Sequence, residues 1–354
     1  MATSEVGSET QKMLHTVGVS IVALMEHMRS FEGTDEQEHA FSAPKFKATV
    51  KDLGRAIDKE VTYMVIACKA PVRDSEVQTL CPKVGAGFFQ LVQQAGRIPK
   101  AAGRTYLLAV REAICQSLVS AVRLINSFIQ HKVEVPRTTG PAVNYITSSG
   151  VFWEHCKELL QVPADNREAA AQTWDAQVGR LVKDAVEELS LSLDEAKDPK
   201  SARPQSIESE DDEFSDDSLD DLDDSIPAAR LEKGRQIEKL AKLAKHTCDK
   251  VALRCIRDST ELDDERTIWL DRLVDLGRPV QCAVDDVIGA LSMPDSEEES
   301  WEECADLCST KLRQALSELI TLAITFVGDS HLAWFDLCRK QLDAAQEKAA
   351  EVVR

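Results

Sequence analysis

The sequence is poor in the residues that break regular structure. Among 354 residues there are 15 glycines and 12 prolines, whereas 43% are hydrophobic and 29% are charged. Sheet proteins with many short strands need frequent turn residues, so this composition disfavours an all-β fold and favours long, rarely interrupted segments. The length permits two or three globular domains with a core of ordinary size.

Long hydrophobic runs are missing as well. The two longest uncharged apolar stretches, 113–122 and 319–328, have ten residues each. Crossing a bilayer as a helix takes about 20 residues. The sequence therefore predicts no transmembrane segment and no membrane partner.

The motifs of catalysis and ligand binding are absent. There is no Walker loop, no Gly-x-Ser-x-Gly elbow, no HExxH pair and no Cys-x-x-Cys. The doublet Gly85-Ala86-Gly87 lies inside a helical pattern, which indicates close helix packing. His155 and Cys156 face different sides of a helix and cannot act together as base and nucleophile. We predict a chain that is not an enzyme and has no cofactor or metal.

The ten cysteines are spread through apolar helical patterns, and the chain opens with Met-Ala-Thr-Ser-Glu instead of a charged-then-apolar leader. Buried free thiols are a better interpretation than metal ligands, even for Cys304 and Cys308, which share a helix face. We expect a reducing compartment, either the cytoplasm or the nucleus.

The negative charge is concentrated in one segment. The formal net charge is −19, and residues 208–224, ESEDDEFSDDSLDDLDD, hold eleven acidic residues and no basic one. Such a run repels itself and buries little apolar surface, so we predict a disordered linker over 198–225. The net charge disfavours direct binding to nucleic acid or anionic lipid, which leaves another protein as the expected partner.

Three serines precede acidic residues at the spacing that acidophilic, casein-kinase-II-type kinases recognise. They are Ser209, Ser218 and Ser296, each with an acid three residues downstream. We regard them as candidate phosphorylation sites. The alternative is that an acidic segment simply contains serines.

Apolar residues recur at three- and four-residue spacing through the rest of the chain, as in amphipathic helices. Six such stretches precede the linker, and the most apolar of them, 106–131, is the expected centre of its bundle. Four long helices follow, over 226–257, 263–293, 295–327 and 330–354. We expect a kink or break at Pro279.

Long helices with short connections assemble into up-and-down bundles. The predicted fold is all-α: two antiparallel up-and-down bundles of long helices joined by a disordered acidic linker. Residues 1–197 form the N-terminal bundle of about six helices, 198–225 the linker, and 226–354 a C-terminal region of about four helices. Whether the C-terminal helices form their own bundle or complete the N-terminal one is open, as is the oligomeric state.

The helix over 230–257 contrasts with the acidic run before it. It holds nine basic residues against three acidic ones, a net charge of +6. A solvated helix face is the simplest interpretation. Nucleic-acid binding is a second. In a third, the acidic linker folds back and masks the helix.

Two stretches carry distinctive motifs. The first reads Gly150-Val-Phe-Trp-Glu-His-Cys, then Val162-Pro-Ala-Asp-Asn-Arg-Glu, and later Val182-Lys-Asp-Ala-Val-Glu-Glu-Leu. The second reads Trp269-Leu-Asp-Arg-Leu-Val-Asp and then Val284-Asp-Asp-Val. In order, spacing and the acidic run between them, they resemble the cyclin-D-binding protein family, also called GCIP or Maid.

This resemblance implies a non-catalytic regulator. Members of the family bind D-type cyclins and helix-loop-helix transcription factors, restrain cell-cycle progression, and occur in nucleus and cytoplasm. The family is also described as having a leucine zipper, but here the heptad of Leu312 and Leu319 continues with Phe326 and Ala333, which favours a packed bundle helix. A cytoskeletal or junctional adaptor is the alternative function, because vinculin-, catenin- and talin-like modules are also long helical bundles.

Within the first motif, the residues from Pro163 to Asn166 predict a corner between two helices. Asp165 or Asn166 is suited to accept backbone N–H bonds at the start of the following helix. Trp153 and Cys156 are three residues apart, and we expect both to anchor the core beneath this corner.

Charged residues of the motifs are the candidate interaction residues. Lys183 and Asp184 are expected on the polar side of their helix, and an acidic stripe is expected from Asp271, Asp275, Asp285 and Asp286. Like charges four apart destabilise a helix slightly, so such a stripe favours a basic partner. The alternative is that an acidic protein has acidic faces without further function.

Overall fold

Helices make up most of the described structure. The computed structural model describes residues 6–35, 41–136, 144–197, 226–258, 262–293 and 300–352. This part of the chain contains no β-strand, and a lone bridge pair joins Thr34 to Pro99. The prediction of an all-α fold is confirmed. The expected linker, 198–225, lies outside the described residues.

The chain forms two compact units. Unit 1 comprises residues 1–170 and 263–268, and unit 2 comprises 171–262 and 269–354. The chain leaves unit 1 within helix α6 (Asn166–Trp174) and passes through it again at the start of helix α9 (Asp264–Ser292).

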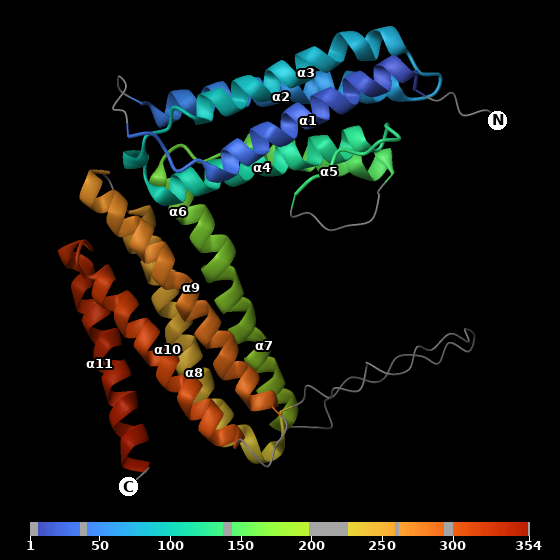
Figure 1. Ribbon diagram of the computed structural model, residues 1–354. Helices are drawn as coiled ribbons and strands as arrows, with labels where there is room; N and C mark the ends of the chain where they lie inside the picture. Colours follow the sequence, from blue (N-terminus) through green and yellow to red (C-terminus); the bar gives the residue numbers. More distant parts are fainter. Residues whose placement is uncertain are drawn as a thin grey trace, which may run out of the picture. The chain divides into compact units, whose positions relative to one another are not determined.

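Five long helices build unit 1. They are α1 (Ser8–Ser30), α2 (Ala43–Cys68), α3 (Asp74–Ala95), α4 (Arg104–Asn126) and α5 (Tyr145–Leu159), with a short 3₁₀ turn η1 (Lys100–Ala102) before α4. Neighbours in space follow the closed order α1, α3, α2, α5, α4, and successive helices alternate in direction (Figure 1). Unit 1 is therefore an up-and-down bundle, as its helical spacing predicts.

Helix α4 is one member of this ring and not its centre, although it is extensively buried, as its apolar sequence predicts. It is buried on most of its circumference, because Leu118, Val119, Ala121 and Val122 point to different sides of the helix and are all shielded from solvent. Close helix packing at the glycine doublet is also confirmed: a Cβ on Gly87 would lie 2.8 Å from Ile57 of α2.

The first turn of α4 requires a glycine. Gly103, directly before it, has φ +103°, a left-handed conformation that costs other residues free energy. A Cβ at this position would also lie 2.2 Å from the side-chain Cγ of Asn166. Both backbone conformation and space therefore exclude a side chain here.

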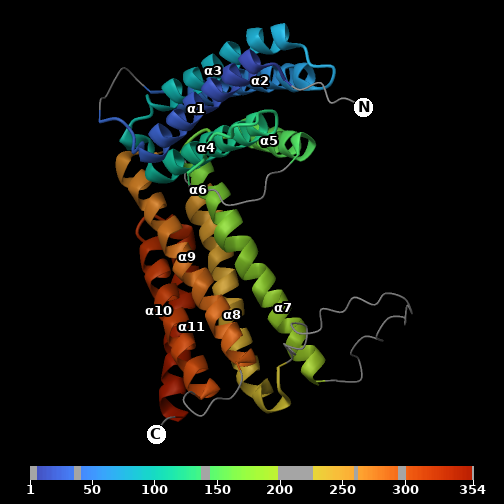
Figure 2. The same ribbon diagram turned by 45° about the vertical axis from the view of Figure 1, so that its right-hand side comes forward.

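Unit 2 has α8 at its centre. Its helices are α7 (Arg180–Lys197), α8 (Leu231–Lys250), most of α9, α10 (Trp301–Ala323) and α11 (Asp329–Val352). A π-helical turn η2 (Asp175–Gly179) precedes α7, a 3₁₀ turn η3 (Ala228–Arg230) precedes α8, and a π-helical segment η4 (Val251–Arg257) extends it. Helix α8 contacts α7, α10 and α11, and Figure 2 shows these helices gathered along it.

The place of α7 differs from the expected division at residues 198–225. Helix α7 packs with the C-terminal helices, because its buried row Val182, Val186, Leu189 and Leu193 faces α8. A Cβ on Gly234 of α8 would lie 2.5 Å from Leu193. The C-terminal helices thus form their own bundle, which includes α7.

Two local features of the C-terminal helices bear on the sequence predictions. No break occurs at Pro279, since α9 continues through it to Ser292; packing of the buried residues Val280 and Val284 outweighs the missing backbone hydrogen bond. The leucine heptad of Leu312 and Leu319 ends as expected, because Phe326 lies in the connection between α10 and α11. Within the described chain, no helix is both long and apolar enough to cross a membrane.

The first prediction concerns Gly103. The Gly103→Ala substitution should lower the free energy of unfolding by about 3 kcal/mol, through backbone strain and overlap with Asn166. Urea unfolding measures the change. The control is Gly96→Ala at the end of α3, where φ is −60° and the nearest neighbour of a Cβ is at 3.5 Å. Equal effects of the two substitutions would contradict this account.

Candidate interaction surfaces

The corner between α5 and α6 is held by reciprocal hydrogen bonds. The Asp165 carboxylate accepts from the backbone N–H of Glu168 at 2.8 Å, and the Glu168 carboxylate accepts from the backbone N–H of Ala164 at 2.5 Å. Lys47 of α2 forms an ion pair with Glu168 at 2.9 Å. Pro163 is buried just before this capping box. The role of these residues is to fix the start of α6.

Asn166 caps helix α4. Its side-chain carbonyl accepts from the backbone N–H of Tyr106, in the first turn of α4, at 2.8 Å. Its amide donates to the carbonyl of Thr267 in α9 at 3.3 Å. Of the two residues expected to cap the next helix, Asp165 does so, while Asn166 reaches the unpaired N–H groups at the start of α4.

The core placement of Trp153 was wrong. Cys156 is buried, but Trp153 is 38% exposed and donates its indole N–H to the Thr62 hydroxyl of α2 at 3.3 Å. The buried row of α5 consists of Phe152, Cys156 and Leu159, spaced four and three apart. Trp153 lies about 100° from Phe152 around the helix and therefore reaches the surface.

The acidic stripe on α9 is interrupted. Asp271 is buried with 9% exposure, whereas Asp275, Asp285 and Asp286 are exposed. Asp271 departs from the expected stripe because α9 is covered on more than one side: Trp269 donates to the carbonyl of Leu322 in α10 at 2.8 Å. Partial desolvation of the Asp285 carboxylate and the nearby charge of Asp286 raise the pKa of Asp285.

Lys183 and Asp184 are exposed on α7, and the ion pair of Lys183 is with Glu187 on the same helix, at 3.8 Å. They lie on a different helix from the four aspartates of α9. The candidate phosphorylation sites Ser209, Ser218 and Ser296 lie outside the described residues.

Most cations of the basic helix have partners within unit 2, some on the helix itself and some on other elements. Three of its residues pair with acids on other elements: Lys233 with Asp306, Arg235 with Asp194 at 2.5 Å, and Arg257 with Asp175 at 2.5 Å. Arg230 is buried, donates to the carbonyls of Leu291 and Met293, and stacks 4.7 Å from the Trp301 ring. Further partners within reach are Glu238 for Lys242, Asp249 for Lys245, Asp258 for Arg254 and the Trp334 ring for Lys250. These contacts favour a structural role over nucleic-acid binding.

Glu238 is the node of this network. Its buried carboxylate accepts hydrogen bonds from Ser190 of α7 at 2.8 Å, from Arg235 at 3.1 Å and from Lys242 at 2.7 Å. Burial alone would raise the pKa of Glu238, but these hydrogen bonds outweigh it and lower the pKa to about 2. Glu238 thus fastens α7 to α8 in its charged form.

The cysteines are free and mostly inert. Eight are buried, Cys282 is exposed and Cys304 is partly exposed. Burial raises the pKa of Cys68, Cys156 and Cys248 to about 12, which suppresses the reactive thiolate. Across the described residues, no group of three His, Cys, Asp or Glu side chains is arranged to hold a metal ion.

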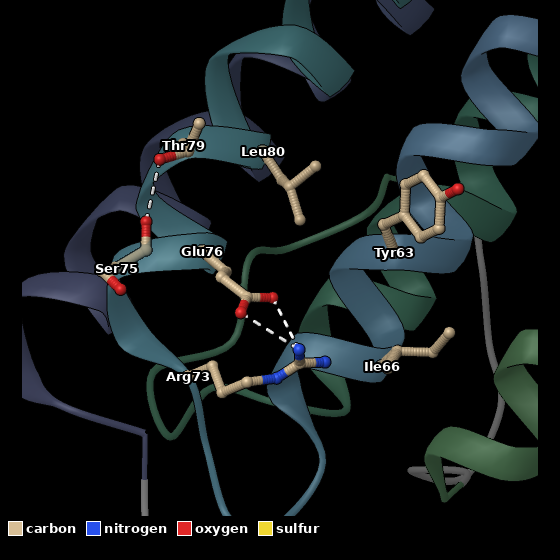
Figure 3. Close-up of a pocket in the computed structure, with 7 residues that line it drawn as sticks. All are labelled: Tyr63, Ile66, Arg73, Ser75, Glu76, Thr79 and Leu80. Carbon is tan, nitrogen blue, oxygen red and sulfur yellow. Dashed lines mark hydrogen bonds and ion pairs between the residues drawn. The ribbon is translucent and has the colours of Figure 1, made fainter.

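Two open grooves mark the surfaces of the units. In unit 1, a groove of about 650 Å³ lies between α2 and α3 and is lined by Tyr63, Ile66, Arg73, Ser75, Glu76, Thr79 and Leu80. Figure 3 shows Tyr63 and Leu80 on opposite helices of the groove and the Arg73–Glu76 ion pair, 2.8 Å long, at its end. In unit 2, a groove of about 480 Å³ is lined by residues of α7 and α8. The first groove continues into exposed apolar side chains and suits a protein surface better than a small-molecule site.

We predict that Glu238→Gln destabilises unit 2 in a pH-dependent way. The folded-state pKa lies below the ordinary value of 4.5, so the charged carboxylate stabilises the fold above pH 4.5 and ceases to do so as the pH falls towards 2. At pH 7 the variant should lose about 2 kcal/mol, and the difference from wild type should shrink between pH 5 and 3. Urea unfolding across this range measures it, with exposed Glu232→Gln as the control; a pH-independent difference would contradict it.

A second prediction from these surfaces concerns thiol reactivity. At pH 7 an aromatic disulfide reagent should modify two thiols in the native chain, Cys282 and Cys304, and all ten after denaturation. Mass spectrometry of the peptides identifies the sites. Native-state modification of Cys156 or Cys248 at a comparable rate would contradict the burial of these two thiols.

Comparison with known proteins finds one family model and several relatives that this chain resembles. Residues 49–195 match the family model described as Grap2 and cyclin-D-interacting, N-terminal. The Cyclin-D1-binding protein 1 homolog of Danio rerio is 25% identical over 365 aligned positions, which cover 98% of this chain and 97% of the relative.

Two further relatives match at similar levels. The Cyclin-D1-binding protein 1 homolog of Xenopus laevis is 25% identical, covering 91% of this chain and 93% of the relative. Cyclin-D1-binding protein 1 of Homo sapiens is 24% identical, covering 94% and 90%. The resemblance inferred from the motifs is thereby confirmed: residues 49–195 match the family model, and the chain is similar to cyclin-D1-binding proteins along nearly its whole length.

Proposed function

We propose that this chain is a non-catalytic protein-interaction factor that binds a D-type cyclin and restrains cell-cycle progression. The observation that supports the proposal most directly is the alignment of more than nine tenths of the chain with relatives named for binding cyclin D1. The two helical units agree with this function, since a factor that acts by occupying a partner needs an accessible surface and no reaction centre. We also propose that the chain occurs in both the cytoplasm and the nucleus, where it encounters a D-type cyclin.

Several surface properties support a protein partner. Fifteen large hydrophobic side chains of the described residues are exposed, among them Tyr63, Ile66, Ile146 and Trp153 of unit 1. The basic helix, the strongest candidate for nucleic acid, has most of its cations engaged within unit 2. Helix-loop-helix factors, which the family resemblance also implies, belong to the same proposal as a second class of protein partner.

We predict that the full chain binds a purified D-type cyclin with a dissociation constant in the micromolar range or below, about −8 kcal/mol. Isothermal titration measures the affinity, and an A-type cyclin is the control partner. Co-sedimentation with filamentous actin tests the adaptor alternative. Absence of cyclin binding together with actin co-sedimentation would overturn the proposal.

A further inference from the structure

Unit 1 exposes an apolar band along α2 and α5. It consists of Tyr63 and Ile66 on α2, which are 49% and 46% exposed, and Ile146 and Trp153 on α5, which are 66% and 38% exposed. Residues three or seven apart share a helix face, so each pair forms one row. The indole of Trp153 bonds Thr62, which brings the two rows side by side.

The two helices run antiparallel, which sets the register of the band. Leu159 and Leu160 of α5 lie near Gly54 of α2, while Trp153 reaches Thr62. The same register continues to Lys69, whose ammonium lies 5.5 Å from the ring centre of Tyr145. Ile66 therefore lies level with the helical turn between Ile146 and Trp153.

A glycine, Gly150, lies at the middle of this band, and we call the open space above it the notch. Gly150 is on the same face of α5 as Ile146 and Trp153, and no atom lies within 4 Å of the position that its Cβ would take. A glycine inside a helix costs about 1 kcal/mol relative to alanine. Internal packing does not explain this glycine, since the space above it is empty. A side chain of a partner helix can therefore approach the backbone of α5 at this point.

Two cations beside the band have no carboxylate partner among the described residues. Lys59 lies 5.9 Å from the ring centre of Tyr63, and Lys69 lies above Tyr145. The other two cations nearby are already neutralised, Arg73 by Glu76 at 2.8 Å and Lys157 by Glu154 at 2.7 Å.

The rest of unit 1 does not oppose an acidic partner. Residues 1–170 hold 19 basic and 18 acidic residues, so essentially all of the formal charge of −19 belongs to residues 171–354. The four apolar side chains expose roughly 400 Å², which is in the range of the largest patches on monomeric proteins and often marks a binding site.

We propose that the apolar band of α2 and α5 docks an amphipathic helix of a protein partner, with an apolar side chain of that helix seated over Gly150 and acidic side chains facing Lys59 and Lys69. Helices that dock in this mode present apolar anchors three, four and seven residues apart, which fits the row of Ile146, Gly150 and Trp153. Complementary charge at the rim orients the helix and accelerates its association. This inference rests on the proposed function, because a D-type cyclin is the protein that presents the helix.

Filling the notch is the first test. Gly150→Leu should leave the melting temperature equal or higher, since it removes a helical glycine without an internal clash, yet weaken cyclin binding at least tenfold in titration calorimetry. The matched control is Gly289→Leu on α9 of unit 2, a helical glycine that also has no atom within 4 Å of its Cβ position. This control should bind like wild type.

Reversing the rim charge is the second test. Lys59→Glu with Lys69→Glu should weaken binding at least tenfold at 50 mM salt and by less at 500 mM salt. The matched control reverses Lys12 and Lys45, exposed lysines outside the band, and should change affinity by less than threefold.

The outcomes separate the two proposals. A wild-type chain that does not bind the cyclin overturns the proposed function and with it this docking mode. A wild-type chain that binds while the Gly150→Leu and double-lysine variants bind equally well overturns the band alone. Sedimentation of the free chain provides a further test: a wild-type dimer that Gly150→Leu dissociates would assign the band to a second copy of the chain instead.

Discussion

The hydrogen bonds of one buried amide organise unit 1. Asn166 accepts from the first turn of α4 and donates to the carbonyl of Thr267, so three segments that are far apart in the chain meet at a single side chain. Gly103 leaves the space that this amide occupies. The capping box of Asp165 and Glu168 then sets the direction in which α6 begins. The corner motif therefore has a structural role, and the candidate interaction surface lies elsewhere on the unit.

Electrostatic pairing has a different role in unit 2. The basic helix follows an acidic segment in the sequence, yet three of its cations pair with Asp175, Asp194 and Asp306, which lie on other elements of the folded chain. Glu238 stays charged while buried because three donors surround it. Charge in unit 2 thus holds helices together, whereas the unpaired Lys59 and Lys69 of unit 1 are available to a partner.

The helical spacing of apolar residues was sufficient to predict the fold class and nearly every helix, since a row such as Val182, Val186, Leu189 and Leu193 has one stable way to be buried. It was insufficient for the division into units, because the same row could cover either bundle. Trp153 shows the limit at a single residue: a shift of one position around α5 moves a large aromatic side chain from the core to the surface. Asp271 shows the opposite case: a charged residue expected at the surface is buried, because α9 is covered on more than one side.

The sequence by itself determined that this chain is helical, that its thiols are free and that it resembles a cyclin-binding family, because each of these follows from local pattern or motif. Tertiary structure alone decided which helix α7 joins, which cations remain unpaired and that no neighbouring side chain covers Gly150. The physical reason is that burial and charge neutralisation depend on neighbours supplied by distant segments. Periodicity indicates which face of a helix is apolar, but the partner that covers that face is chosen only when the whole chain packs.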